Sequence, residues 1–196
     1  HLADCADPDC ANHTACGGTQ TNDDIPWECK VYDPWASFLP DGSGIQNFQK
    51  LQQLKSQHPH LKTLISLGGW TLSGNFSDIA LSAQSRAGFI DSCVQFMLTH
   101  GFDGIDVDWE YPGGGGLSSN TARPEDTENF TLLLSEFRAA LDAQGDYLLT
   151  IAAPAAPTTV ANMELPAIAD HLDWINVMAY DYYGPWDLSA TNHNSQ

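Results

Sequence analysis

The pattern of apolar and polar positions divides the chain from residue 45 onward into helical and extended segments. Apolar residues at helical spacing predict helices over about 45–57, 77–99, 123–145 and 160–171. Compact apolar runs predict strands over about 61–67, 102–111, 147–153 and 174–180. This alternation of helix and strand predicts an α/β fold, a parallel sheet covered by helices. At this point both a doubly wound sheet and a (β/α)₈ barrel fit the pattern.

Local signals suggest where the helices begin and end. Ser77-Asp78 are expected to cap the second helix, and Gly101 follows its end. Arg123-Pro124-Glu125-Asp126 are expected to open the third, because proline and acidic residues suit a first helical turn. Pro166 must start or kink the fourth.

Residues 1–44 lack periodicity and are predicted to form a cysteine-rich loop segment ahead of a domain spanning 45–196. Four cysteines fall in the first thirty residues: Cys5, Cys10, Cys16 and Cys29. Their even number predicts a disulfide-stapled loop, with three pairings open. A zinc site is the alternative, although the C-x₂-C spacing is absent. Cys93 lies in an apolar helical pattern and is predicted to be a buried free thiol.

Composition narrows the classes of partner and the compartment. The formal net charge is −18, with 25 acidic and 7 basic residues, which disfavours a nucleic acid or an anionic membrane as partner. The apolar runs are too short to span a bilayer. The cysteines, with N-x-S/T sequons at Asn12, Asn75 and Asn129, predict an extracellular glycoprotein. The histidines show no metal-like spacing, and no metal or cofactor is expected.

The predicted strand at 102–111 carries the main candidate chemistry. Alternate side chains of a strand share a face, so Asp106, Asp108 and Glu110 point one way, with apolar residues between them pointing the other. Strict alternation puts Asp103 on the opposite face. Repulsion among three carboxyls on one buried face should raise at least one pKa, as a general acid requires. An exposed acidic edge and a divalent metal site are the alternatives.

The same residues resemble a known family signature. Asp103-x-x-Asp106-x-Asp108-x-Glu110 resembles the D-x-x-D-x-D-x-E signature of family 18 glycoside hydrolases, the chitinase family. Ser66-Leu67-Gly68-Gly69-Trp70 resembles the S-x-G-G motif that ends the third barrel strand. Met178-Ala179-Tyr180-Asp181 resembles the M-x-Y-D motif that ends the sixth. The three motifs fall at predicted strand ends in the family's order, and the resemblance covers about residues 45–187.

The resemblance implies a (β/α)₈ TIM barrel and a retaining, substrate-assisted mechanism without a metal. Glu110 would act first as acid and then as base. Asp108 would orient the substrate's acetamido group, Asp106 would share a proton with Asp108, and Asp103 would be a supporting residue.

The resemblance also implies the sugar contacts. Tyr180 would donate a hydrogen bond to the acetamido oxygen, and Asp181 would help to hold the sugar. Gly69, Trp70, Tyr111 and Met178 are the further expected substrate-binding residues, because aromatic and apolar surfaces suit sugar rings. Trp186 is a weaker candidate. Trp109 and Trp174 are expected to point away from the site into the core.

By these motifs the recognisable strands are numbers three to six, so the barrel is predicted to be incomplete. An open four-stranded sheet leaves two edges for self-association or for further barrel segments. The predicted function is chitinase activity on chitin or chito-oligosaccharides. The alternatives are an endo-β-N-acetylglucosaminidase and a non-catalytic chitin-binding lectin on the same scaffold.

Overall fold

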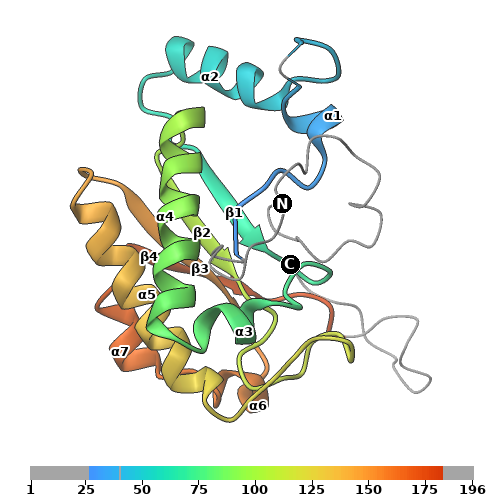
Figure 1. Cartoon of the computed structure of the whole chain (residues 1–196), viewed down its shortest axis with the longest axis vertical. Coiled ribbons are helices and arrows are strands. Elements are labelled where there is room, and N and C mark those ends of the chain that lie inside the picture. Colours follow the sequence, from blue (N-terminus) through green and yellow to red (C-terminus); the bar gives the residue numbers. More distant parts are fainter. Residues whose placement is uncertain (1–26, 40, 183–196) are drawn as a thin grey trace.

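A computed structural model describes residues 27–39 and 41–182 and contains a four-stranded parallel sheet. The strands follow one another in the order β1 (Leu64–Gly68), β2 (Gly104–Asp108), β3 (Leu148–Pro154) and β4 (Trp174–Met178). Along the chain, helices connect each strand to the next, as Figure 1 shows. The four strands predicted from the sequence are confirmed, and so is their parallel arrangement.

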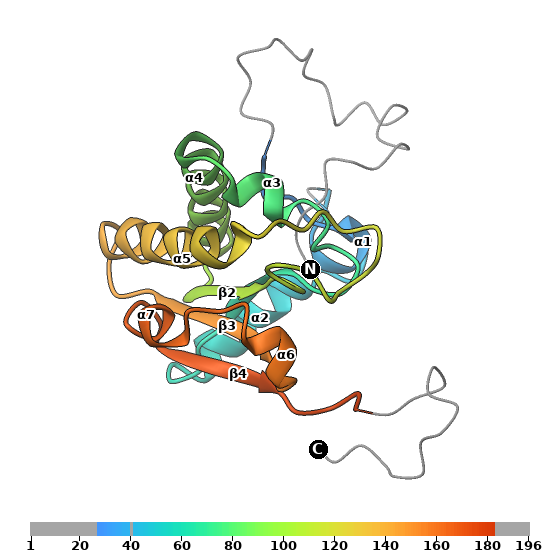
Figure 2. The same cartoon turned by 90° about the horizontal axis from the view of Figure 1, so that it is seen from below.

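Seven helices lie in the described ranges: α1 (Pro34–Ser37), α2 (Asn47–Gln57), α3 (Phe76–Ala80), α4 (Ala83–His100), α5 (Asp126–Asp142), α6 (Pro157–Val160) and α7 (Leu165–Ala169). The two longest, α4 and α5, pack side by side against one face of the sheet (Figure 2). None of the described helices is long and apolar enough to cross a membrane.

The core lies between the sheet and these helices. Trp109 is 1% exposed; its ring stacks on Phe76 at 5.4 Å between centroids and meets the edge of Phe130 at the same distance. Ile105 and Val107 of β2 are fully buried on this side. The apolar residues that alternate with the carboxyls therefore form the core, as predicted, and burial fixes which face of β2 the carboxyls occupy.

The predicted helix over 77–99 is in fact two helices, and the prediction that Ser77-Asp78 caps it is wrong. Ser82 breaks the segment and caps α4: its hydroxyl accepts a hydrogen bond from the Ser85 amide at 3.1 Å. Ser77 is instead buried within α3, where its hydroxyl donates to Asp126 at 2.6 Å. The predicted end of α4 is confirmed, because Gly101 follows it with a left-handed φ of 71°.

The predicted helix over 160–171 is also divided. Pro157 begins α6, and Pro166 lies in the first turn of α7. Proline fits there because the first-turn amides have no partner within the helix. Pro166 therefore starts a new helix rather than kinking a longer one.

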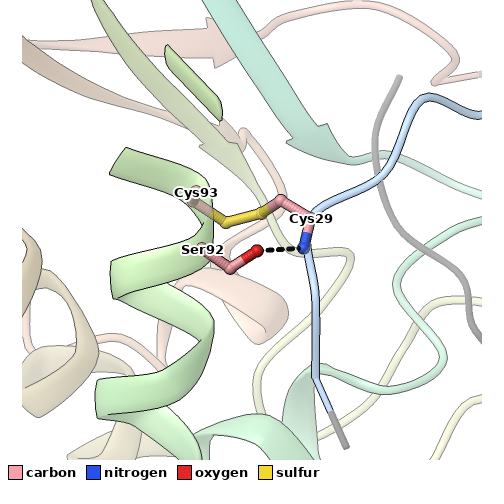
Figure 3. The surroundings of a disulfide bond; sticks show 3 residues. All are labelled: Cys29, Ser92 and Cys93. Carbon is pink, nitrogen blue, oxygen red and sulfur yellow. Dashed lines mark hydrogen bonds between the residues drawn. A yellow bond between two sulfur atoms is a disulfide. The ribbon is translucent and has the colours of Figure 1, made fainter. Parts of the chain in front are cut away.

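The segment before α2 is tied to the helical layer by a disulfide bond. Cys29 pairs with Cys93 of α4, and the Cys29 amide donates to the Ser92 hydroxyl at 2.8 Å (Figure 3). The predictions of a free Cys93 thiol and of Cys29 bonded within the amino-terminal cluster are both wrong. The spacing of cysteines in the sequence could not reveal a bond between residues 64 positions apart. Closing a loop of this length should stabilise the fold by about 4 kcal/mol, because it lowers the entropy of the unfolded chain. Cys5, Cys10 and Cys16 lie outside the described residues.

Two aspartates join neighbouring strands at their amino ends. The Asp103 carboxylate accepts from the Thr63 amide at 2.8 Å, and the Asp103 amide donates to the Thr63 carbonyl at 2.7 Å. Asp173 makes the same pair of bonds with Leu149, at 2.7 and 2.9 Å. Each aspartate thus links the residue before its own strand to the start of a neighbouring strand.

Candidate active site

A cavity of about 710 Å³ opens at the carboxyl ends of the strands, the end opposite Asp103. Seven of the residues proposed from the sequence line it: Trp70, Asp108, Glu110, Tyr111, Met178, Tyr180 and Asp181. They come from the ends of β1, β2 and β4, three separate stretches of the chain. The parallel sheet brings them together because its strands all end on the same side.

The paired glycines at the end of β1 allow that strand to approach Asp108 closely. A Cβ on Gly68 would lie 2.3 Å from the Asp108 carbonyl oxygen, and Gly68 has a φ of +99°. The Gly69 amide donates to the same carbonyl at 2.7 Å. A Cβ on Gly69 would lie 3.5 Å from the Asp108 carboxylate. Gly69 therefore lies beside the Asp108 carboxylate, although it is not itself part of the cavity lining.

Two of the three carboxyls that line the cavity, Asp108 and Glu110, hold their protons more tightly than usual. Burial, followed by the charges of Glu110 and Asp106, raises the pKa of Asp108 to about 7. Burial also raises the pKa of Glu110, with the charge of Asp181 adding to the rise and a hydrogen bond from Tyr111 opposing it. Among the described residues Asp108 Oδ1 is buried without a hydrogen-bond partner. Asp108 can therefore hold and exchange a proton near neutral pH, and the raised pKa of Glu110 favours its protonated form.

Asp106 lies one step deeper along β2 and is held by polar groups from the next two strands. Its Oδ1 accepts from the Thr150 hydroxyl at 2.5 Å and from the Asn176 amide at 3.1 Å. Asn176 in turn accepts from the Trp174 indole at 3.0 Å. These donors stabilise the negative charge of Asp106, which acts on Asp108 beside it.

The position of Trp174 contradicts the expectation that it points away from the site into the core. It is 46% exposed, and its indole bonds to Asn176 on the face that also carries Met178. The error was one of phase, because Trp174, Asn176 and Met178 are alternate residues of β4 and share a side. The matching expectation for Trp109 is confirmed, since that residue is buried.

Aromatic side chains surround the carboxyls. Burial and the charges of Glu110 and Asp108 raise the pKa of Tyr111, so its hydroxyl stays protonated and can donate. Burial and the same two carboxyls, Asp108 first, also raise the pKa of Tyr180. Trp70 and Tyr180 are each about half exposed at the cavity mouth, which leaves their surfaces accessible to a ligand. Trp186 lies outside the described residues.

Asp103 lies outside the cavity, at the amino end of β2. Burial would raise its pKa, but hydrogen bonds from Lys55 and Thr63 and the charges of Lys55 and Lys62 lower it instead. Lys55 forms an ion pair with it at 2.6 Å. Within 27–39 and 41–182, no three histidine, cysteine or acidic side chains are arranged to hold a metal ion.

Sequence reasoning missed several residues of the site. Thr150 and Asn176 contact Asp106. Tyr182 lines the cavity just after the Met178–Asp181 motif. The signal for the first two was present, because each is a single polar residue on the inner face of an otherwise apolar strand.

The four strands form a segment of a (β/α)₈ barrel with an acidic pair at its carboxyl end, an arrangement that defines a class of glycoside hydrolases. Residues 18–196 match the family model "Glycosyl hydrolases family 18", and the chain belongs to this family.

Several of the proteins that this chain resembles are chitinases. Chitinase A1 of Niallia circulans is 52% identical over 152 residues, which cover 74% of this chain and 22% of that protein. The structure of chitinase ChiA74 from Bacillus thuringiensis superposes with a TM-score of 0.78 at 43% identity, covering 85% of this chain and 29% of that one.

A mutant of Ostrinia furnacalis Group II chitinase catalytic domain 2, described as a complex with penta-N-acetylchitooctaose, is 32% identical with a TM-score of 0.70. The superposition covers 81% of this chain and 40% of that one. The chain thus spans about a fifth of the first curated relative and less than half of each of these structures.

Proposed function

We propose that this chain carries the acid-bearing half of a chitinase active site, for retaining hydrolysis of β-1,4-linked N-acetylglucosamine polymers. The observation that carries the proposal is the pair Asp108 and Glu110, both with raised pKa, opening into one aromatic-rimmed cavity. A carboxyl that keeps its proton near neutral pH is the group that glycosidic oxygen needs as a general acid.

The reaction would run in two steps. Glu110 gives its proton to the glycosidic oxygen while the substrate's own acetamido oxygen attacks the anomeric carbon, which breaks the glycosidic bond and forms an oxazolinium ring. Glu110, now a carboxylate, then takes a proton from water as the water oxygen opens that ring. Two inversions at one carbon give net retention.

Asp108 would orient the acetamido group and balance the positive charge that develops on the ring. Once Asp108 has passed its proton to Asp106, which Thr150 and Asn176 hold beside it, its carboxylate can accept a hydrogen bond from the acetamido N–H. Asp103 would act only as a support for β2, through its bonds to Lys55 and Thr63.

Sugar recognition would fall to the residues around the cavity mouth. Tyr180, whose hydroxyl stays protonated, would donate to the acetamido oxygen, and Asp181 would accept from a sugar hydroxyl. Trp70, Tyr111 and Met178 offer surfaces on which the C–H faces of pyranose rings pack. Gly69 would leave the room beside Asp108 that a ring substituent needs.

We also propose that the protein works outside the cell. The Cys29–Cys93 bond supports an oxidising compartment, because disulfides are rare where thiols are kept reduced. Of the sequons, Asn129 has a buried side chain, which disfavours a glycan there. Asn75 is partly exposed, and Asn12 lies outside the described residues.

The test is hydrolysis of a fluorogenic chitotriose substrate by the purified 196-residue chain beside a Glu110→Gln control. We expect turnover that the control lowers by about a thousandfold or more, because glutamine cannot donate the proton. Calorimetric titration of both proteins with unmodified chito-oligosaccharide measures binding separately.

The outcomes separate the candidate functions. Binding without turnover by the wild-type chain would support the chitin-binding lectin instead. Cleavage of an N-glycan core in preference to chitotriose would support the endo-β-N-acetylglucosaminidase. A folded sample that shows no binding and no turnover would contradict the proposal for this chain.

A further inference from the structure

The backbone of Glu110 is held on both sides by side chains from two different loops. Glu110 lies beyond the end of β2, so the sheet ladder does not fix its peptide groups. Its amide donates to the Ser73 hydroxyl at 2.8 Å. Its carbonyl accepts from the Asn120 side-chain amide at 3.1 Å. Ser73 belongs to the loop after β1, and Asn120 to the glycine-rich loop after β2.

Ser73 is built into this position. It is fully buried, and besides accepting from Glu110 its hydroxyl lies 2.8 Å from the Gly69 carbonyl and 3.1 Å from the Asp108 carbonyl, to which it can donate. A hydroxyl can accept one bond and donate another at the same atom, so Ser73 connects the end of β1 to both residues of the acidic pair. An alanine would leave the Glu110 amide buried without a partner.

The glycine-rich loop closes on Glu110 from the other side. A Cβ on Gly116 would lie 2.1 Å from the Glu110 carbonyl oxygen, so the loop runs directly against that peptide. Next to Asn120, the Thr121 amide donates to the carbonyl of Gly74, the residue after Ser73, at 3.4 Å. The two loops that supply the holding groups therefore also contact each other.

The far end of the glycine-rich loop is anchored in the core. Asp126, fully buried at the start of α5, accepts from the amides of Gly113 and Arg123 at 3.2 and 2.8 Å. Its other oxygen accepts from Ser77 of α3 at 2.6 Å. The loop is thus fixed at both ends, and its position is transmitted to Glu110 through Asn120.

We propose that Ser73 and Asn120 are positioning residues for Glu110, which hold its backbone from two loops and so aim its carboxyl into the cavity. Neither side chain lines the cavity, so both act through Glu110 rather than on a ligand. The inference rests on the proposed function insofar as Glu110 is the acid. Loosening either contact lets water reach the carboxyl, so its proton is lost at lower pH.

The test compares Ser73→Ala and Asn120→Ala with the wild-type chain, and uses Ser92→Ala as the matched control. The Ser92 hydroxyl, like that of Ser73, accepts from a distant backbone amide at 2.8 Å, that of Cys29, but Ser92 belongs to α4 and not to the loops that hold Glu110. The Glu110 carboxyl is titrated by NMR in protein carrying ¹³C-labelled glutamate, with Glu110→Gln to assign its signal. Hydrogen exchange of the Glu110 amide is measured in the same samples. Neither measurement needs turnover, so each stands even where hydrolysis is absent.

We expect both variants to lower the pH at which Glu110 titrates, and Ser73→Ala to speed exchange of the Glu110 amide by about tenfold or more. Where turnover is present, kcat should fall about tenfold with little change in KM, because the acid is displaced while the sugar contacts remain. The alkaline limb of the pH profile should move to lower pH.

The proposal would be overturned if Glu110 titrated and exchanged as in the wild type in both variants, or if Ser92→Ala shifted them equally. Should Ser73→Ala fail to fold, Asn120→Ala decides, because Asn120 is a half-buried loop residue whose truncation leaves the core intact.

Discussion

The two sides of the cavity are built differently. On the β2 side Glu110 is 8% exposed, and side chains from two loops hold its peptide groups. On the β4 side Tyr180 is 49% exposed, and Val177 is 59% exposed on the opposite face of the strand. The groups proposed to carry protons are thus embedded in the packed core, while those proposed to recognise the sugar lie at its open margin.

This difference follows from what each group must do. A proton carrier needs a dry, fixed setting, because burial is the first cause of the raised pKa of both Asp108 and Glu110. A sugar contact needs an accessible surface. The stability of the described fold should therefore depend on the β2 side and hardly at all on the β4 side, and four comparisons can break or sharpen that contrast.

The largest contrast is between two tryptophans. Trp109→Ala removes a ring that is 1% exposed and packed against Phe76 and Phe130, so unfolding should become easier by about 4 kcal/mol. Trp174→Ala removes an exposed ring and should cost about 1 kcal/mol or less. Urea unfolding followed by circular dichroism measures both. Equal losses would mean that β4 is as deeply embedded as β2.

A smaller loss is expected where β1 meets Asp108. Gly68→Ala would put a Cβ 2.3 Å from the Asp108 carbonyl at a φ of +99°, and should cost about 3 kcal/mol. Gly42→Ala is the matched control: its φ is +78° and nothing lies within 4 Å, so backbone conformation alone should cost about 1 kcal/mol. The same urea titration compares them, and a Gly68 variant no worse than the control would show that the close approach can relax.

The third comparison concerns the dependence of stability on pH. Asp108 has a pKa of about 7 in the folded chain against an ordinary 3.8, so between these values the folded state keeps a proton that the unfolded chain loses. The contribution of Asp108 to the stability of the wild-type chain therefore falls as the pH rises from 3.8 to about 7. Asp108→Asn cannot ionise, so its melting temperature relative to wild type should rise across the window and level off above it.

The measurement is thermal unfolding from pH 4 to 8, with Asp142→Asn as an exposed control. A constant difference between Asp108→Asn and wild type over the whole range would contradict the raised pKa.

The smallest effect on stability is expected for Tyr180→Phe. The hydroxyl lies on a half-exposed side chain, so the free energy of unfolding should change by less than about 0.5 kcal/mol. Under the proposed function kcat should nevertheless fall about a hundredfold, because a hydrogen bond to the reacting acetamido group is lost. A variant with full turnover would remove Tyr180 from the proposed mechanism.

The sequence was most informative where one physical signal decided the structure. Alternation along 102–111 predicted which face of β2 carries the carboxyls, because a buried apolar face leaves one register. For Trp174 the alternation was also sound, because it places Trp174 on the same side as Met178, and only the assignment of Trp174 to the core was wrong.

Contacts between distant segments could not be predicted. Cys29 and Cys93, or Ser73 and Glu110, meet only because the sheet brings their elements together. Ser82 was different, since its role as a cap depends on residues three positions away and was available from the sequence.

The aspartates at the amino ends of the strands have a consequence for the opposite end. Strands in a parallel ladder can slip, and a slip of β2 by one residue would turn it inside out, with Val107 toward the cavity and Asp108 into the helical layer. Asp103 opposes such a slip, because its carboxylate and its amide both form hydrogen bonds with the Thr63 backbone. Glu110 lies seven positions after Asp103, a distance of about 23 Å along an extended strand. The hydrogen bonds at one end of the barrel segment thus fix the strand register that aligns Glu110 at the other end.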